Sequence, residues 1–151
     1  DKTGTAAAAP SEGDITMSYD RIGVIGAMDS ELAALIAALT QPARETVQGL
    51  VFHTGRLGAR EVVLVRCGIG KVSAARCTQV LIDRFAPGAV INTGIAGGLA
   101  SGLAVGDIVV ADGLVQHDFD AAPIGFVRGC LCMGDPGAPT VFAPTERTAN
   151  V

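Results

Sequence analysis

Apolar residues along the first two thirds of the chain follow two different periods. Short, mostly apolar runs predict strands, at residues 21–26, 49–56, 60–66, 89–92 and 105–110. Two longer stretches carry apolar side chains at helical spacing and predict helices, at residues 30–39 and 72–85. We expect Pro42 to end the first helix and Pro87 to end the second.

The order of these elements indicates the kind of sheet. The strand runs at 49–56 and 60–66 are separated by a short segment around Gly58, which predicts a hairpin. The helix at 72–85 then returns the chain to the strand at 89–92 as a crossover. The sequence therefore predicts an α/β fold with a mixed central sheet and flanking helices.

Composition divides the 151 residues into three parts. Residues 1–20 are small and polar, so they bury too little surface to offset the entropy lost on ordering, and they predict a flexible leader. Residues 21–133 hold the regular pattern and predict one α/β domain. Residues 134–151 begin with a stretch rich in Gly and Pro and predict an irregular end.

Charge and cysteine usage narrow the class of protein. The net charge is -4 and there is no basic run to pair with phosphates, which argues against nucleic acid and anionic membranes as partners. No apolar stretch is long enough for a membrane span, and no signal peptide is evident. The cysteines have no C-x-x-C spacing and the histidines are far apart, so we expect no metal site. Cys67 and Cys77 lie in or beside apolar segments, so we expect buried reduced thiols there. Reduced cysteines fit a cytoplasmic protein best.

Three glycine-rich turns follow predicted strands, where ligands bind in α/β sheets. They read Ile-Gly-Ala-Met-Asp-Ser-Glu, Cys-Gly-Ile-Gly-Lys-Val-Ser-Ala and Asn-Thr-Gly-Ile-Ala-Gly-Gly-Leu, and Val-Gly-Asp-Ile-Val follows. Glycine lets the backbone approach a ligand and adopt dihedrals that a Cβ forbids, although a single such turn is often only a tight corner. Together the four segments resemble the 5'-methylthioadenosine/S-adenosylhomocysteine nucleosidases of the nucleoside phosphorylase superfamily. The resemblance runs from about Arg21 to Gly125 and covers only the front of the family's chain.

The resemblance implies hydrolysis of the N-glycosidic bond of methylthioadenosine or S-adenosylhomocysteine, without a cofactor. It assigns Glu31 to the attacking water. A carboxylate in the first turn of a helix stays charged readily, which suits that role and equally suits an ordinary helix-start glutamate. A carboxylate there would repel the phosphate that a phosphorylase must bind, so water is the better reactant.

The resemblance also implies the substrate contacts and the partner. The contacts to the nucleoside fall on Met28, Ile69, Ile95, Ala96 and Gly97, with Ile69 near the alkylthio group. Many relatives have serine at the position of Ile95. Ile124 matches a residue that reaches into the partner's pocket, which implies a homodimer.

Residues beyond about 125 depart from the family pattern. The glutamate that grips the ribose and the Ser-Asp pair that protonates adenine have no counterpart, so we expect a fold truncated on its C-terminal side. A His-Asp-Phe-Asp segment ending at Asp120 favours a structural or dimer-contact role over catalysis. Two alternatives to the hydrolase stay open: an inactive nucleoside-binding or structural fragment, and a nucleoside phosphorylase. We also expect the strands at 89–92 and 105–110 to be central ones with exposed apolar surface.

Overall fold

A computed structural model describes residues 19–131 and 136–143. The expected leader lies outside the described residues except for Tyr19 and Asp20, as do Cys132 and much of the Gly/Pro-rich end. The contacts divide the chain into two compact units, residues 1–97 and 98–151, which we describe separately.

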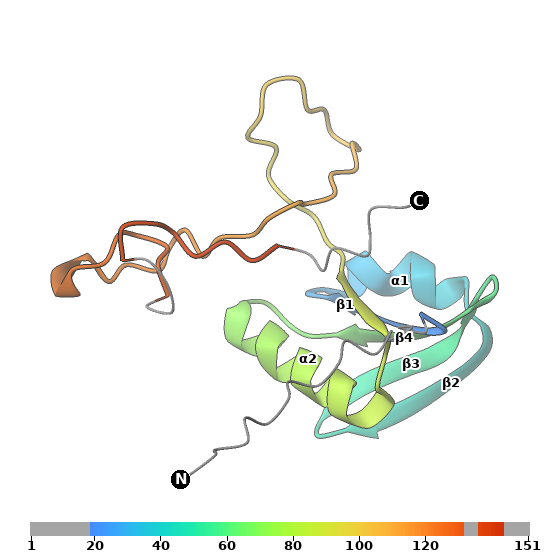
Figure 1. The fold of residues 1–151 in the computed structure, drawn as a ribbon. Coiled ribbons are helices and arrows are strands. Elements are labelled where there is room, and N and C mark those ends of the chain that lie inside the picture. Colours follow the sequence, from blue (N-terminus) through green and yellow to red (C-terminus); the bar gives the residue numbers. More distant parts are fainter. Residues whose placement is uncertain (1–18, 132–135, 144–151) are drawn as a thin grey trace, which may run out of the picture. The chain divides into compact units, whose positions relative to one another are not determined.

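The first unit is built on a five-stranded sheet in the order β2-β3-β4-β1-β5 (Figure 1). Its strands are β1 (Arg21–Gly26), β2 (Thr40–Val47), β3 (Leu50–Leu57), β4 (Arg60–Arg66) and β5 (Ala89–Asn92). Its helices are α1 (Asp29–Ala37) and α2 (Lys71–Phe85). β1 runs parallel to β4 and β5, whereas β2, β3 and β4 pair antiparallel. The expected α/β fold with a mixed sheet and flanking helices is confirmed, including the hairpin at Gly58.

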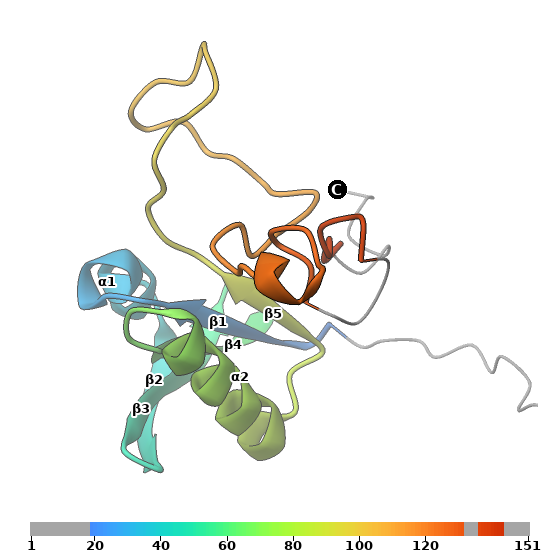
Figure 2. The same cartoon turned by 90° about the vertical axis from the view of Figure 1, so that its left-hand side faces the viewer.

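Both faces of the sheet are covered, each by one helix (Figure 2). Alternate residues of β4 point to opposite faces: Val63 and Val65 join the core that contains α2, and Val62 and Leu64 join the core that contains α1. Burial on both faces explains why β1 and β4 read as continuous apolar runs.

Strand β2 was not expected from the sequence, and Pro42 does not act as the helix terminator. Helix α1 already ends at Ala37, and Pro42 lies inside β2. β2 is the edge strand of the sheet, where a residue without an N–H is tolerated. The register between β2 and β3 shifts between Thr40 and Ala43, and Gln41 there has a φ of 52°. Six of the eight residues of β2 are exposed, which hides the apolar period of a strand.

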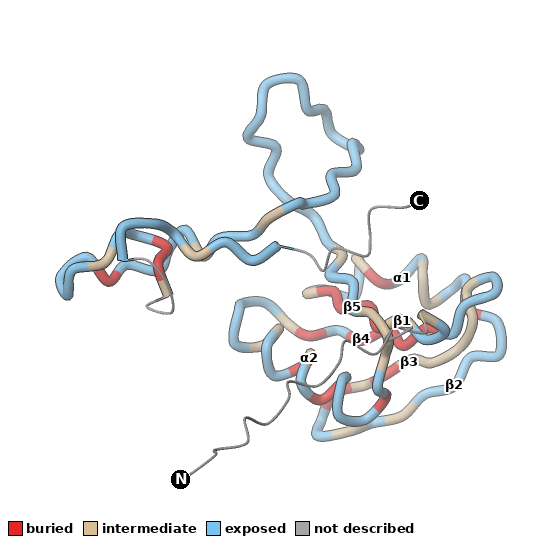
Figure 3. Tube along the Cα trace, viewed as in Figure 1, coloured by how far each residue is buried: buried red, intermediate tan, exposed pale blue. Residues whose placement is uncertain are grey.

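The second unit contains little regular structure among its described residues. A short 3-10 helix, η1, spans Ala122–Ile124, and a single bridge joins Leu114 to Phe142. The expected strand at 105–110 is wrong: these residues form a turn and irregular backbone. Residues 94–112 are all exposed (Figure 3), so the apolar run of Val105–Val110 has no packing partner within the described residues of its unit. Propensity alone does not hold a strand without a neighbour.

The expectation of exposed apolar surface is confirmed for both segments. Ile91 of β5 is 49% exposed, and Ile108 and Val110 are 92% and 89% exposed. β5 is not a central strand, however, because it occupies the other edge of the sheet.

Candidate active site

Two turns and one helix start meet at the carboxyl ends of the three parallel strands. β1 continues into the N-terminus of α1, β4 into the turn before α2, and β5 into the glycine-rich turn after Asn92. Backbone hydrogen bonds hold these segments side by side: the Cys67 N–H donates to Gly26 O at 2.9 Å, and the Thr93 N–H donates to Ile25 O at 2.9 Å. Parallel pairing therefore brings together residues that are far apart in the sequence.

The start of α1 is held close to the sheet by the absence of a side chain at Gly26. A Cβ there would lie 2.9 Å from Leu32 Cγ, and Leu32 is only 1% exposed. Gly26 thus lets Leu32 pack directly on β1 and fixes the first turn of α1, which carries Glu31.

Glu31 places its carboxylate between two of these segments. Its Oε2 accepts the Met28 N–H at 2.9 Å, which satisfies a free donor at the helix start. Its Oε1 accepts the Ile95 N–H at 3.1 Å from the glycine-rich turn. These backbone bonds, from Met28 first and then Ile95, hold the pKa of Glu31 below its usual range. The side chain is therefore ionised at neutral pH, and with the Ala27 N–H as a smaller third contribution its two oxygens still have more lone-pair sites than N–H partners.

The glycines of the two turns serve different purposes. Gly68 and Gly70, in the turn between β4 and α2, have φ values of 84° and 99°, which favour glycine. Gly94, Gly97 and Gly98 do not have positive φ. A positive φ therefore does not explain the glycines of the turn after β5, contrary to the expectation, and close approach to another group is seen at Gly94, where a Cβ would lie 2.8 Å from Glu31 Oε1.

Three of the expected site residues are joined by hydrogen bonds, and the others differ in placement. The Glu31 carboxylate accepts the N–H groups of Met28 and Ile95, as described above. Ala96 and Gly97 follow in the same turn and are exposed. Ile69 is 78% exposed in the turn before α2, and Ile124 is 72% exposed in the second unit.

Cys67 is a neighbour of Glu31 that the sequence did not place in the site. Its thiol is buried, and desolvation first, with the charge of Glu31 as a smaller contribution, raises the pKa of this thiol. The parallel pairing of β1 and β4 could have indicated this position, because Cys67 follows β4 as Ala27 follows β1. The expectation of buried thiols at Cys67 and Cys77 is confirmed.

Asp120 has a local structural role in the second unit. Its Oδ1 accepts the Ala122 N–H at the start of η1 at 3.0 Å, and its Oδ2 pairs with Arg128 at 3.1 Å. The Ala122 N–H, followed by Arg128, holds the pKa of Asp120 below its usual range. An ionised carboxylate cannot donate a proton to a leaving group at neutral pH.

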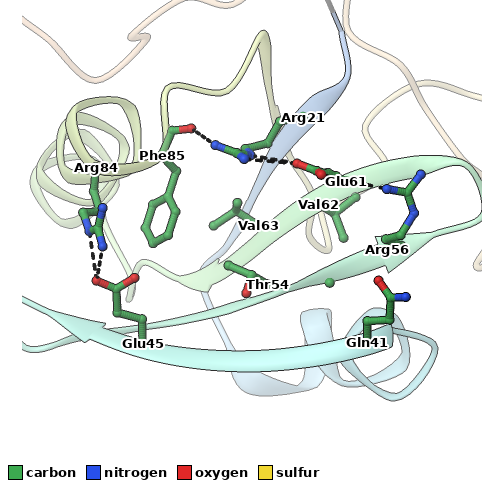
Figure 4. Close-up of a pocket in the computed structure, with 11 residues that line it drawn as sticks. Arg21, Gln41, Glu45, Thr54, Arg56, Glu61, Val62, Val63, Arg84 and Phe85 are labelled. Carbon is green, nitrogen blue, oxygen red and sulfur yellow. Dashed lines mark hydrogen bonds and ion pairs between the residues drawn. The ribbon is translucent and has the colours of Figure 1, made fainter.

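A separate pocket of about 440 Å³ lies at the opposite end of the parallel strands (Figure 4). Its charged side chains already pair with one another: Arg21 with Glu61 at 3.1 Å, and Arg84 with Glu45 at 2.8 Å. Arg21 also donates to Phe85 O at 2.8 Å. These groups offer few free partners to a ligand.

Within residues 19–131 and 136–143, no group of three or more His, Cys, Asp or Glu side chains is arranged to hold a metal ion. None of the helices in the same part of the chain has the length and apolar character needed to cross a membrane.

Comparison with known proteins gives several relatives of one kind. A 5'-methylthioadenosine/S-adenosylhomocysteine nucleosidase from Shewanella pealeana is 42% identical over 127 residues, which are 84% of this chain and 54% of the relative. One from Shewanella baltica is 44% identical over 124 residues, or 82% and 51%. The chain thus spans about half the length of the curated relatives it matches.

Solved structures agree with the sequence relatives. The S-adenosylhomocysteine nucleosidase of Streptococcus pyogenes, in complex with 5-methylthiotubericidin, matches with a TM-score of 0.75 and 41% identity over 85% of this chain and 52% of that chain. The nucleosidase of Colwellia psychrerythraea in complex with adenine matches with a TM-score of 0.76 and 42% identity, over 85% and 52%. Residues 21–149 match the family model of the phosphorylase superfamily. The resemblance drawn from the four motifs is confirmed, and the chain belongs to the phosphorylase superfamily.

Proposed function

We propose that this chain carries the water-activating part of a nucleosidase that hydrolyses the N-glycosidic bond of 5'-methylthioadenosine or S-adenosylhomocysteine and releases adenine. The observation that supports this most is the Glu31 carboxylate, ionised and anchored to the backbone of Met28 and Ile95 where the turns meet. The names of the relatives supply the substrate class.

Glu31 suits the role of a base toward water. In hydrolysis the bond between the sugar carbon and the adenine nitrogen breaks and the adenine takes up a proton from a general acid, while the water oxygen bonds to the sugar carbon and the water gives up a proton. A carboxylate with free lone pairs beside the sugar accepts that proton and stabilises the positive charge that develops on the ring. Anchoring both oxygens to N–H groups fixes the direction of the remaining lone pairs.

The turn residues are proposed as nucleoside contacts. Ile95, Ala96 and Gly97 would lie along the ribose and base with Met28, and the exposed Ile69 would meet the alkylthio group. Ile124 would complete the pocket of a second copy in a homodimer. We place the protein in the cytoplasm, with a small nucleoside as its ligand, no cofactor, and no nucleic acid or membrane as partner.

A second candidate is a chain that binds the nucleoside without cleaving it. This reading is favoured by Asp120, whose lowered pKa makes it unsuitable as the acid for adenine. Loss of a general acid lowers a rate by a factor of about 10² to 10⁴.

The experiment is adenine release from methylthioadenosine, followed by chromatography, for the wild-type chain and Glu31→Gln. The variant keeps the shape of the side chain and removes its basicity, so we expect turnover to fall to background while binding measured by calorimetry changes only a few-fold. Equal turnover by both proteins would remove Glu31 from the mechanism. Binding without turnover in the wild type would favour the second candidate. Release that requires phosphate and yields a sugar phosphate would instead identify a phosphorylase.

A further inference from the structure

Gly94 directly precedes the residue whose N–H binds Glu31, and it has no positive φ that would itself require glycine. The space around its α-carbon is occupied by one group. A Cβ built there would lie 2.8 Å from Glu31 Oε1, 3.1 Å from its Cδ and 3.5 Å from its Oε2. All three nearest atoms thus belong to the same carboxylate.

The geometry points to Gly94 as the positioning residue for Glu31: the missing side chain leaves the space through which the carboxylate reaches the Ile95 N–H. This inference rests on the proposed role of Glu31 as the base toward water. It goes beyond that role because it says what fixes the direction of the carboxylate.

The distances predict that a methyl group at position 94 would break one of the two hydrogen bonds of Glu31 and keep the other. An added methyl group collides with Oε1, which binds Ile95, but stays 3.5 Å from Oε2, which binds Met28. The carboxylate is the far end of a flexible side chain, so it can rotate away without moving the backbone. Gly94→Ala should therefore break the Ile95 bond, keep the Met28 bond and leave the fold intact.

Gly97 provides a matched control in the same turn. It also lacks a positive φ, and a Cβ there would meet no atom within 4 Å. Gly97→Ala adds the same methyl group with no contact to Glu31.

The first test uses the whole chain and does not depend on turnover. Amide and carboxyl NMR signals are followed during a pH titration of wild type, Gly94→Ala and Gly97→Ala. In wild type and Gly97→Ala, the amides of Met28 and Ile95 should both report the ionisation of Glu31. In Gly94→Ala the Ile95 response should disappear, the Met28 response should remain, and the pKa of Glu31 should rise toward the ordinary value because one N–H donor is lost. An unchanged pKa and an unchanged Ile95 response would overturn the inference.

A thermal comparison tests the same contact by a second route. Gly94→Ala should lower the Tm of wild type but leave the Tm of Glu31→Ala unchanged, since the latter has no carboxylate to displace. An equal fall in both backgrounds would show that the methyl group collides with something else, and the inference would fail.

Turnover separates this inference from the proposed function. Where adenine release is measurable, Gly94→Ala should lower kcat about 100-fold with a smaller change in KM, and move the acidic limb of the pH profile upward. Loss of the Ile95 response without any turnover in wild type would support the positioning role and refute the hydrolytic one. Full turnover by Gly94→Ala with a displaced carboxylate would show that the position of Glu31 does not matter to the reaction.

Discussion

Gly26→Ala tests how the sheet positions the helix that carries Glu31. The new Cβ would lie 2.9 Å from Leu32 Cγ, about 0.6 Å inside the separation of about 3.5 Å at which two carbon atoms pack comfortably. Leu32 is 1% exposed and packs directly on β1, so α1 or the side chain must shift to relieve this contact. Overpacking of this kind costs about 1–3 kcal/mol, and we expect Tm to fall by at least about 2 °C.

The assay is thermal and urea unfolding followed by circular dichroism, with Gly97→Ala as the control. That control adds a methyl group in open space, so its stability should stay equal to wild type or rise slightly. Leu32→Ala alone should cost about 2–5 kcal/mol because it leaves a cavity.

The double variant, Gly26→Ala with Leu32→Ala, tests whether the contact with Leu32 causes the loss of stability. With Leu32 shortened, the methyl group at position 26 no longer collides with Cγ and fills part of the cavity, so Gly26→Ala should cost little in that background. If the double variant loses as much unfolding free energy as the two single variants together, within about 0.5 kcal/mol, the packing argument is refuted.

Three further predictions follow from other features. Gly97→Val should weaken methylthioadenosine binding only through contact with the ligand, because the position is neither strained nor crowded; unchanged affinity by calorimetry would exclude a close approach there. Burial raises the pKa of Cys77 from 9.0 to about 11, so the neutral thiol is favoured in the fold, and stability should hold below about pH 9 and decline as pH rises toward 11; the urea midpoint of Cys77→Ala should lack that decline. The exposed apolar residues of 94–112 should bind a hydrophobic dye, and supplying the remaining half of a relative in trans should reduce the signal; a monodisperse protein that binds no dye would contradict this.

Local periodicity was enough to predict the buried elements of the first unit. β1, β4 and α2 carry apolar residues at spacings that depend only on their own neighbours in sequence. β2 was missed because an edge strand with six exposed residues has no such pattern. The run at 105–110 has the composition of a buried strand, but composition does not supply the partner that a strand requires.

The candidate site was likewise predicted only in part from the sequence. Glu31 and the turn around Ile95 could be found because motifs state residue types at fixed spacing. The contact between them could not, since they are 64 residues apart and meet only when β5 pairs with β1. The space at Gly94 and the proximity of Cys67 to Glu31 are likewise properties of the paired strands and not of any one segment.

Strand β5 has only four residues, pairs with β1 alone among the described strands, and carries the turn that reaches Glu31. Short edge elements open at lower free energy than the centre of a sheet. The Glu31 carboxylate and the turn after β5 are therefore joined only in the fraction of molecules whose β5 is docked, and under the proposed function the affinity for a nucleoside would be the intrinsic affinity reduced by that fraction. A nucleoside that contacts the turn would in return protect the amides of β5 from hydrogen exchange, so ligand binding and the closure of this sheet edge are one coupled equilibrium.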